Sequence, residues 1–318
     1  MTKIEWVARQ GTIPESWNPI GGCEAISDGC QNCWAARLAA TRLKHHPLYE
    51  GLTTRRSDGS YRWTGEIRLD YDEIFKPLHW HKPRTVFVTS TSDLFHYRVP
   101  DTYIKKEIWS VMVDCKQHTF LLLTKRPTRA FELLESHTPW PKNIWLGVTA
   151  ENQQYAEERI PVLLQIPAAV RFVSCEPLLG PIQFHSMGTD TDCLDILSST
   201  RWNENGIMNI PKVDWIITGG ETGSRARPMH PYWARSLRNQ CQVAGMSYFH
   251  KQNGEFMEVI DNFRDNDTVL MHDGKVLGRY DVWADKIIEK GYTVVRRVGK
   301  KQAGHLLNGK EYHQWPDT

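Results

Sequence analysis

Three cysteines gather near the start of the chain, in the segment NPIGGCEAISDGCQNCWA. Cys23, Cys30 and Cys33 lie within eleven residues and directly precede a helical pattern. Cysteine thiolates bind zinc or iron–sulfur clusters, and a cluster is usually held by four of them. Three cysteines with no nearby fourth therefore predict either a cluster with one iron open to a small molecule, or a zinc site completed by a residue such as His45 or His46.

The composition is that of an ordinary globular protein of 318 residues, with 40% hydrophobic and 24% charged side chains. The 39 basic and 37 acidic side chains nearly cancel, so only a local basic patch would indicate a polyanionic partner. An odd number of cysteines and the polar N-terminus MTKIEWVARQ argue against an exported, disulfide-linked protein. We expect a cytoplasmic protein without a membrane span, in which the scattered cysteines are core or incidental thiols (Cys115, Cys175, Cys193 and Cys241).

Short apolar runs alternate with helical patterns along most of the chain. Strands are expected at 16–20, 85–90, 118–124, 143–149, 170–175 and 213–219. Helices are expected after Cys33 and at 101–116, 127–136, 151–166 and 229–244. Such alternation implies parallel strands joined by crossover helices, and about six units predict an α/β fold, a partial (β/α)6 TIM-like barrel.

Two segments interrupt this alternation, and a third follows it. Residues 44–84 are rich in charge, glycine and aromatic residues and are interpreted as an insertion after the first helix. Residues 185–212 form a polar excursion before the sixth strand, and short strand-like pieces follow residue 250. We therefore expect a barrel domain over 1–250 and a small C-terminal cap over 251–318.

Polar side chains follow the expected strands at the points where the strands end. The segments are TSTSDLFH, TKRP, TAEN, SCEP and TGGETGSRARP, and the cysteine loop follows the first strand in the same way. In parallel barrels the loops after the carboxyl ends of the strands build the active site. A structural zinc has no reason to lie there, so the position favours the iron–sulfur cluster. The candidate residues at this rim are Ser92, Asp93, Lys125, Thr149, Glu151, Glu176, Glu221, Arg225 and Arg227.

The cysteine loop and these strand ends resemble a known family. SWNPIGGC, GCQNCWA, VFVTSTSDLFH, FLLLTKRP, WLGVTAENQ and FVSCEPLLGPI are similar to a phage-associated three-cysteine-motif family of radical S-adenosylmethionine (SAM) proteins. More distantly, TSD and TK resemble the branch of spore photoproduct lyase and DNA-repair-photolyase-like proteins. Six residues separate the first two cysteines, where three are commonest in the superfamily, and Trp34 follows the third cysteine, where an aromatic residue usually precedes it.

The resemblance implies a [4Fe–4S] cluster on Cys23, Cys30 and Cys33, with SAM bound to the fourth iron. Reductive cleavage of SAM would then release a 5′-deoxyadenosyl radical that abstracts hydrogen from a substrate, with a flavodoxin-like or ferredoxin-like reductant. The resemblance places Ser92 and Asp93 at the amino group of SAM. By charge and position, Lys125 is expected at the SAM carboxylate, Thr149 and Glu151 at the ribose, and Glu176 and Glu221 at the adenosine or the substrate. The alternatives are helix caps for Asp93 and Thr149 and a surface position for Lys125.

The substrate prediction depends on arginines. Arg225 and Arg227, beside Glu221, suit a phosphate or carboxylate, although GGETGSRARP lacks the Gly-Lys-Ser/Thr ending of a phosphate-binding loop. The insertion TTRRSDGSYRW mixes arginine with aromatic residues, as single-strand binders do. We therefore expect a nucleic acid or nucleotide substrate, the alternatives being a partner protein or a zinc-stapled nucleic-acid-binding module without catalysis. His96, His230 and His250 are expected to be structural.

Overall fold

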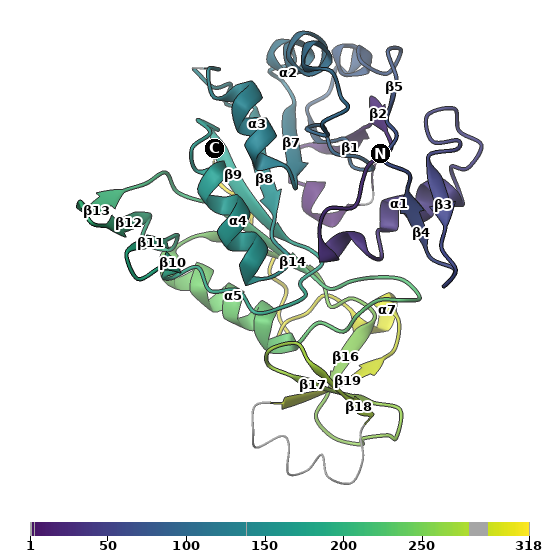
Figure 1. Ribbon diagram of the computed structural model, residues 1–318, viewed down its shortest axis with the longest axis vertical. Coiled ribbons are helices and arrows are strands. Elements are labelled where there is room, and N and C mark those ends of the chain that lie inside the picture. The colour runs from purple at the N-terminus through teal and green to yellow at the C-terminus, as the bar shows by residue number, and fades with distance from the viewer. Residues whose placement is uncertain (1, 3, 138, 280–291, 318) are drawn as a thin grey trace. The chain divides into compact units, whose positions relative to one another are not determined.

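The main feature of the protein is one curled parallel sheet of seven strands, a half barrel (Figure 1). It is seen in a computed structural model that describes residues 2, 4–137, 139–279 and 292–317. The strands follow one another in the order β1 (Ile13–Trp17), β6 (Arg84–Val88), β7 (Thr119–Thr124), β8 (Ile144–Thr149), β9 (Val170–Cys175), β14 (Trp215–Gly219) and β15 (Ser247–Gln252). This arrangement confirms the prediction of a mixed α/β, barrel-like fold.

Two details of the sheet differ from the sequence prediction. The first strand ends at Trp17 instead of running over 16–20, because Pro19 has no N–H to donate to a strand ladder. A seventh strand, β15, adds to the six expected and pairs in parallel with β14. The strands over 85–90, 118–124, 143–149, 170–175 and 213–219 are present, with ends shifted by a few residues.

Helices connect the strands close to the positions expected. They are α1 (Trp34–Ala40), the π-helical η4 (Tyr103–Ile108) with α2 (Trp109–Asp114), α3 (Pro127–Leu134), α4 (Gln153–Leu163) and α5 (Pro231–Ala244). A short helix that was not expected, α7 (Lys300–Ala303), follows the last strand. Short 3-10 turns occur at η1 (Glu5–Val7), η2 (Asp28–Cys30) and η3 (Lys76–His79). No helix within the described ranges is long and apolar enough to span a membrane.

By its internal contacts the chain divides into two compact units. Unit 1 comprises Met1–Thr149, Glu158–Val173 and Asp317–Thr318, and unit 2 comprises Ala150–Glu157 and Ser174–Pro316. The expected boundary near residue 250 stays a prediction.

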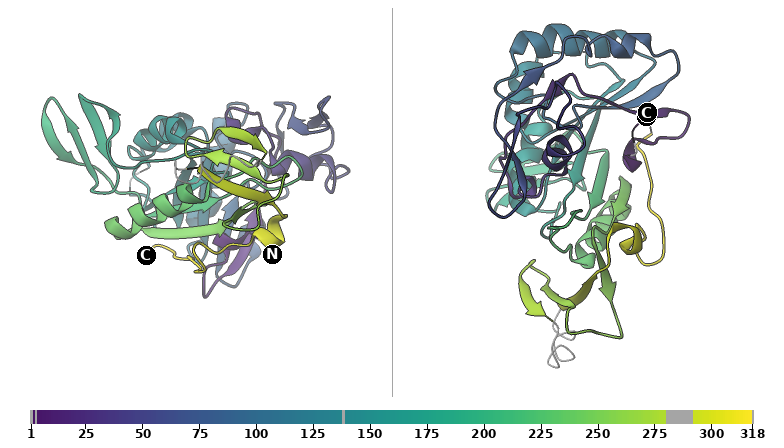
Figure 2. Two further views of the ribbon diagram at one scale, coloured as in Figure 1. Left: turned by 90° about the horizontal axis from the view of Figure 1, so that it is seen from below. Right: turned by 90° about the vertical axis from the view of Figure 1, so that its right-hand side faces the viewer.

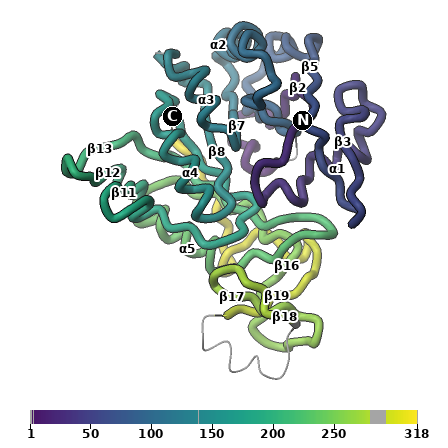
Figure 3. Tube along the Cα trace, viewed as in Figure 1, coloured from purple at the N-terminus to yellow at the C-terminus, as the bar shows by residue number. Residues whose placement is uncertain are grey.

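Unit 1 contains the cysteine loop and the insertion. The insertion begins with β3 (Thr53–Arg55) and β4 (Tyr61–Trp63), an antiparallel hairpin that stands beside α1 (Figure 3). Its β5 (Arg68–Leu69) pairs with β2 (Ile20–Gly21), just before the cysteine loop. The Trp17 indole also donates to the carbonyl of Glu73 at 2.8 Å. The insertion is therefore bonded to both strands that lead into the cysteine loop.

Unit 2 carries two small antiparallel sheets. The polar excursion is a four-stranded meander of β10 (Met187–Thr189), β11 (Asp192–Asp195), β12 (Thr200–Asn203) and β13 (Gly206–Asn209), which stands out beside α5 (Figure 2). The second sheet has the order β16 (Phe256–Val259), β19 (Tyr292–Arg297), β17 (Thr268–Met271) and β18 (Val276–Arg279). The strand-like pieces expected after residue 250 are therefore confirmed.

Candidate functional site

The three cysteines lie in unit 1 on the loop that joins β2 to α1. Cys30 ends the short η2 turn, and Cys33 immediately precedes α1. All three are half-buried and have free thiols. Gly22, with φ +92°, starts the loop where any side chain would collide with the carbonyl oxygen of Glu66. The loop is therefore fixed at both ends, by a glycine packed against the insertion and by the first turn of α1.

The thiols lie within electrostatic reach of one another. The pKa of Cys23 is raised to about 12, chiefly by burial, with smaller increases from Asp93, Cys33 and Cys30 and an opposing decrease from Arg126. Burial also raises the pKa of Cys33, with a smaller contribution from Cys30. As thiolates they would repel one another, so a bound cation would be needed to keep all three deprotonated. Within the described residues, no three His, Cys, Asp or Glu side chains are arranged to hold a metal ion.

Hydrogen-bonding groups lie beside the sulfurs of Cys30 and Cys33. Ser27 Oγ lies 3.5 Å from Cys30 Sγ. Hydrogen bonds from the backbone amides of Ala36 and Ala35 and from the Trp63 side chain each lower the pKa of Cys33. Donors of this kind stabilise thiolate ligands and tune iron–sulfur clusters. The donor set therefore fits sulfur ligands of a metal group.

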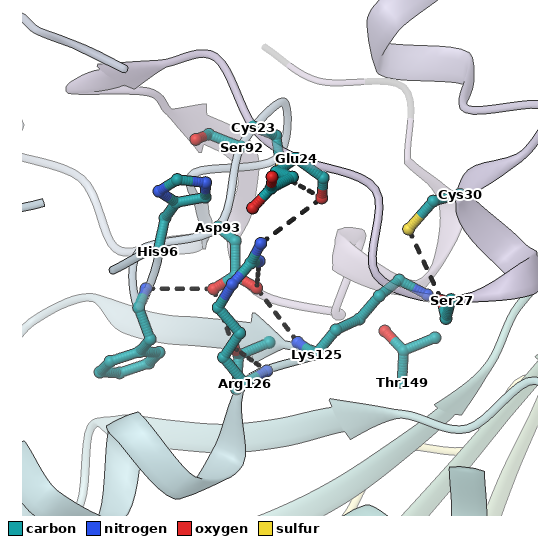
Figure 4. A network of polar contacts seen from close by, with 12 residues as sticks. Cys23, Glu24, Ser27, Cys30, Ser92, Asp93, His96, Lys125, Arg126 and Thr149 are labelled. Atoms are coloured by element: carbon teal, nitrogen blue, oxygen red, sulfur yellow. Dashed lines mark hydrogen bonds and ion pairs between the residues drawn. The ribbon is translucent and has the colours of Figure 1, made fainter. Parts of the chain in front are cut away.

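Asp93 and Arg126 form the centre of the polar network beside the loop (Figure 4). Arg126 Nη1 donates to Asp93 Oδ2 at 2.9 Å, and the two side chains are only 11% and 7% exposed. Arg126 Nη2 donates to the carbonyl of Glu24 at 3.4 Å. Burial lowers the pKa of Arg126, but Asp93 and a hydrogen bond to Cys23 raise it above its ordinary value. Arg126 thus joins the carboxylate after β6 to the cysteine loop.

Both oxygens of Asp93 are engaged within the chain. Oδ1 accepts from the Phe95 amide at 3.0 Å and from Thr124 Oγ1 at 2.8 Å, and Oδ2 also accepts from the Lys125 amide at 3.2 Å. The bond from Phe95 closes a local turn, and no helix follows Asp93 before η4, so the alternative that Asp93 caps a helix over LFHYRVP is wrong. The carboxylate therefore positions the turn after β7, and its role toward the amino group of SAM stays a prediction.

The other candidates of unit 1 lie around the same network. Ser92 Oγ donates to the carbonyl of Gly22, which pins the start of the cysteine loop. Thr149 is buried at the end of β8, and its carbonyl accepts from Arg159 Nη1 at 2.7 Å. Lys125 is half-buried directly before Arg126. The expectation that the ends of β6, β7 and β8 would bring these residues near the cysteines agrees with Figure 4.

The candidates of unit 2 form two ion pairs at strand ends. Arg227 forms a bidentate ion pair with the buried Glu221: its Nη2 donates to Oε1 at 2.6 Å and its Nε donates to Oε2 at 3.0 Å. Glu176, directly after β9, pairs with Lys251 of β15 at 2.7 Å. Arg225 is exposed, whereas Glu151 is fully buried. The charge of Arg227 is thus already matched by a carboxylate, and a role toward substrate phosphate stays a prediction for both arginines.

Sequence reasoning missed three of these residues. Arg126 stood in the TKRP segment, but its neighbour Lys125 was selected for the SAM carboxylate. Trp63 was interpreted as a base-stacking residue, whereas it is 8% exposed and packs behind the cysteine loop. Lys251 belongs to the strand that was not predicted. The signal for Arg126 was available, because a cation in the loop after a barrel strand is a candidate by position.

The comparisons with known proteins give one finding. A family model described as "Protein of unknown function (DUF5131)" matches residues 1–316. The chain belongs to this family. Neither the comparison with curated proteins nor that with solved structures gave a match.

Proposed function

We propose that this member of the DUF5131 family is a radical SAM enzyme whose Cys23, Cys30 and Cys33 hold a [4Fe–4S] cluster. The observation that carries the proposal is the loop itself. Its three thiols influence one another electrostatically, lie among hydrogen-bond donors, and follow the first strand of a parallel half barrel. A three-cysteine set leaves one iron of such a cluster open to SAM.

When bound, the cluster and SAM would supply one-electron cleavage of the SAM sulfonium and a 5′-deoxyadenosyl radical. The chain's own part is to hold and shield these groups. Arg126 keeps positive charge beside Cys23, and Asp93 fixes Arg126 in place. Lys125 is proposed for the SAM carboxylate, Ser92 and Asp93 for its amino group, and Thr149, Glu151 and Glu176 for the adenosine part.

The substrate is proposed to be a nucleic acid or nucleotide. Glu221, Arg225 and Arg227 are the residues proposed to face it in unit 2. The electron is proposed to come from a flavodoxin-like or ferredoxin-like reductant in the cytoplasm.

A zinc-stapled module is the alternative, and it requires a fourth ligand near the loop. In the structure His46 Nδ1 accepts from the Leu48 amide at 3.2 Å. Among the described residues no three His, Cys, Asp or Glu side chains are arranged to hold a metal ion, so this finding favours neither zinc nor the cluster.

Anaerobic purification, followed by reconstitution with iron and sulfide, distinguishes the two. The enzyme should be brown, bind iron and sulfide, and release 5′-deoxyadenosine from SAM when reduced. Cys23→Ala, Cys30→Ala and Cys33→Ala should each abolish iron binding, whereas Cys193→Ala, on β11, should retain it. A colourless protein that binds zinc through the same three cysteines, or equal iron in wild type and the triple variant, would contradict the proposal.

A further inference from the structure

One short part of unit 1 has an excess of positive charge, as residues 296–310 of unit 2 also do. Between residues 37 and 62 the chain has six basic and two acidic side chains, a net charge of +4 in a chain whose total is +2. The six basic residues are Arg37, Arg42, Lys44, Arg55, Arg56 and Arg62. The remainder of the chain is thus slightly acidic. The neutral overall charge conceals a local basic surface of the kind that attracts a polyanion.

This segment is folded: it comprises most of α1 and the β3–β4 hairpin, which pack on each other. The inner face of α1, with Ala36 and Ala39, packs on Leu52 of the insertion and Trp63 of β4. Arg37, Arg42, Lys44, Arg55 and Arg62 are exposed, and Arg56 is half-buried. Arg62 Nε donates to the neutral hydroxyl of Thr54 across the hairpin at 3.3 Å. Trp63 pairs with Thr53 on the side of the hairpin that packs against α1, and Arg62 pairs with Thr54 on the opposite side, so Arg62 is held toward solvent.

An exposed tryptophan lies within the same piece. Trp34, the first residue of α1, is 44% exposed, although tryptophan is usually well buried. It stands three residues before Arg37, so the two share one face of the helix. An exposed indole beside guanidinium groups is the combination with which proteins stack unpaired bases and bind the adjoining phosphates. Trp63 cannot do this, because it is buried under the hairpin.

We propose that this α1–hairpin surface, made of Trp34, Arg37, Arg42, Lys44, Arg55 and Arg62, binds single-stranded nucleic acid. The surface adjoins the cysteine loop, since Trp34 follows Cys33 directly. That it holds the substrate rests on the proposed function, whereas the binding itself does not. The inference moves the main phosphate contacts from Arg227, which is paired with Glu221, to the hairpin.

The test is a salt titration of binding to a fluorescent single-stranded oligonucleotide, with the matching duplex in parallel. Each phosphate contact to a single strand contributes about 0.7 to the slope of log affinity against log salt. The variant Arg42→Gln/Arg55→Gln/Arg62→Gln should therefore lose about 2 from the magnitude of that slope. Lys105→Gln/Lys106→Gln/Lys116→Gln removes the same charge from exposed positions elsewhere in unit 1 and should keep the slope.

Trp34 tests the stacking part. Trp34→Ala should weaken single-strand binding by about fivefold or more, and Trp34→Phe should retain most of it. Equal slopes for the two triple variants, no binding at low salt, or a preference for the duplex would overturn the inference. SAM cleavage and iron content, measured on the same preparations, separate the proposals. If the protein cleaves SAM but does not bind the oligonucleotide, only this inference is contradicted. If it binds the oligonucleotide but contains no iron, only the proposal of a radical SAM enzyme is contradicted.

Discussion

Replacing Arg126 by glutamine should destabilise the protein strongly, because it leaves the buried carboxylate of Asp93 without a counter-charge. Removing one partner of a buried ion pair costs about 3–5 kcal/mol. Asp93 would still accept from Phe95, Thr124 and Lys125, so we expect the lower end of that range, about 3 kcal/mol.

The assay is urea unfolding at neutral pH, followed by tryptophan fluorescence and circular dichroism. Arg129→Gln is the matched control on α3, the helix that Arg126 directly precedes, because Arg129 pairs with Asp101, whose side chain is 58% exposed. An exposed pair contributes about 0–1 kcal/mol. The double variant Asp93→Asn/Arg126→Gln should cost less than the sum of its single variants, since no charge is then left unpaired. If Arg126→Gln costs no more than Arg129→Gln, or if the two changes are additive, the reasoning about this pair is wrong.

Three other predictions concern a histidine, a glycine and a tryptophan. Burial lowers the pKa of His250 to about 4, so between pH 6.5 and 4 the unfolded chain binds a proton that the folded chain does not. The contribution of neutral His250 to the free energy of unfolding is therefore complete above about pH 6.5 and is lost as the pH falls toward 4. Urea unfolding between these pH values should show a steeper loss for wild type than for His250→Gln, and parallel curves would contradict the assignment. Gly147→Ala should cost about 1–3 kcal/mol, seen as a lower melting temperature, because its Cβ would overlap the Phe172 ring, and an unchanged melting temperature would refute that packing. Trp63→Phe should keep the fold but make the reduction potential of a reconstituted cluster more negative, because Cys33 loses a hydrogen bond; redox titration measures this, and an unchanged potential would count against the contact.

The sequence predicted the half barrel because most of its strands are buried on both faces and are nearly continuous apolar runs. IWLGVT of β8 is buried throughout, as a central parallel strand should be. The strand that was missed, SYFHKQ, contains His250, Lys251 and Gln252, whose polar side chains make no such run. Its pairing with β14 is a long-range contact that local patterns do not encode.

In the candidate site, too, some contacts could be predicted from the sequence and others could not. The position of Asp93 beside the residues after β7 could be predicted, because parallel strands bring their carboxyl ends to one edge. The bond from Arg126 to the cysteine loop could not, since it depends on how the side chains of three separate loops meet. Trp63 was predicted to stack on a base of a bound nucleic acid, because aromatic residues near arginines resemble a binding motif. Only the packing of the hairpin on α1 reveals that it supports Cys33.

The packing of Trp63 also matters for anyone who wishes to shorten this protein. The insertion looks dispensable as a sequence, yet deleting its hairpin would remove Trp63, which packs against α1 and Cys33. The β10–β13 meander is different, because its strands bond to one another in a four-stranded sheet of their own. A minimal version should therefore be sought by trimming the meander. In a shortened relative that has lost the hairpin, another aromatic residue should fill the place of Trp63.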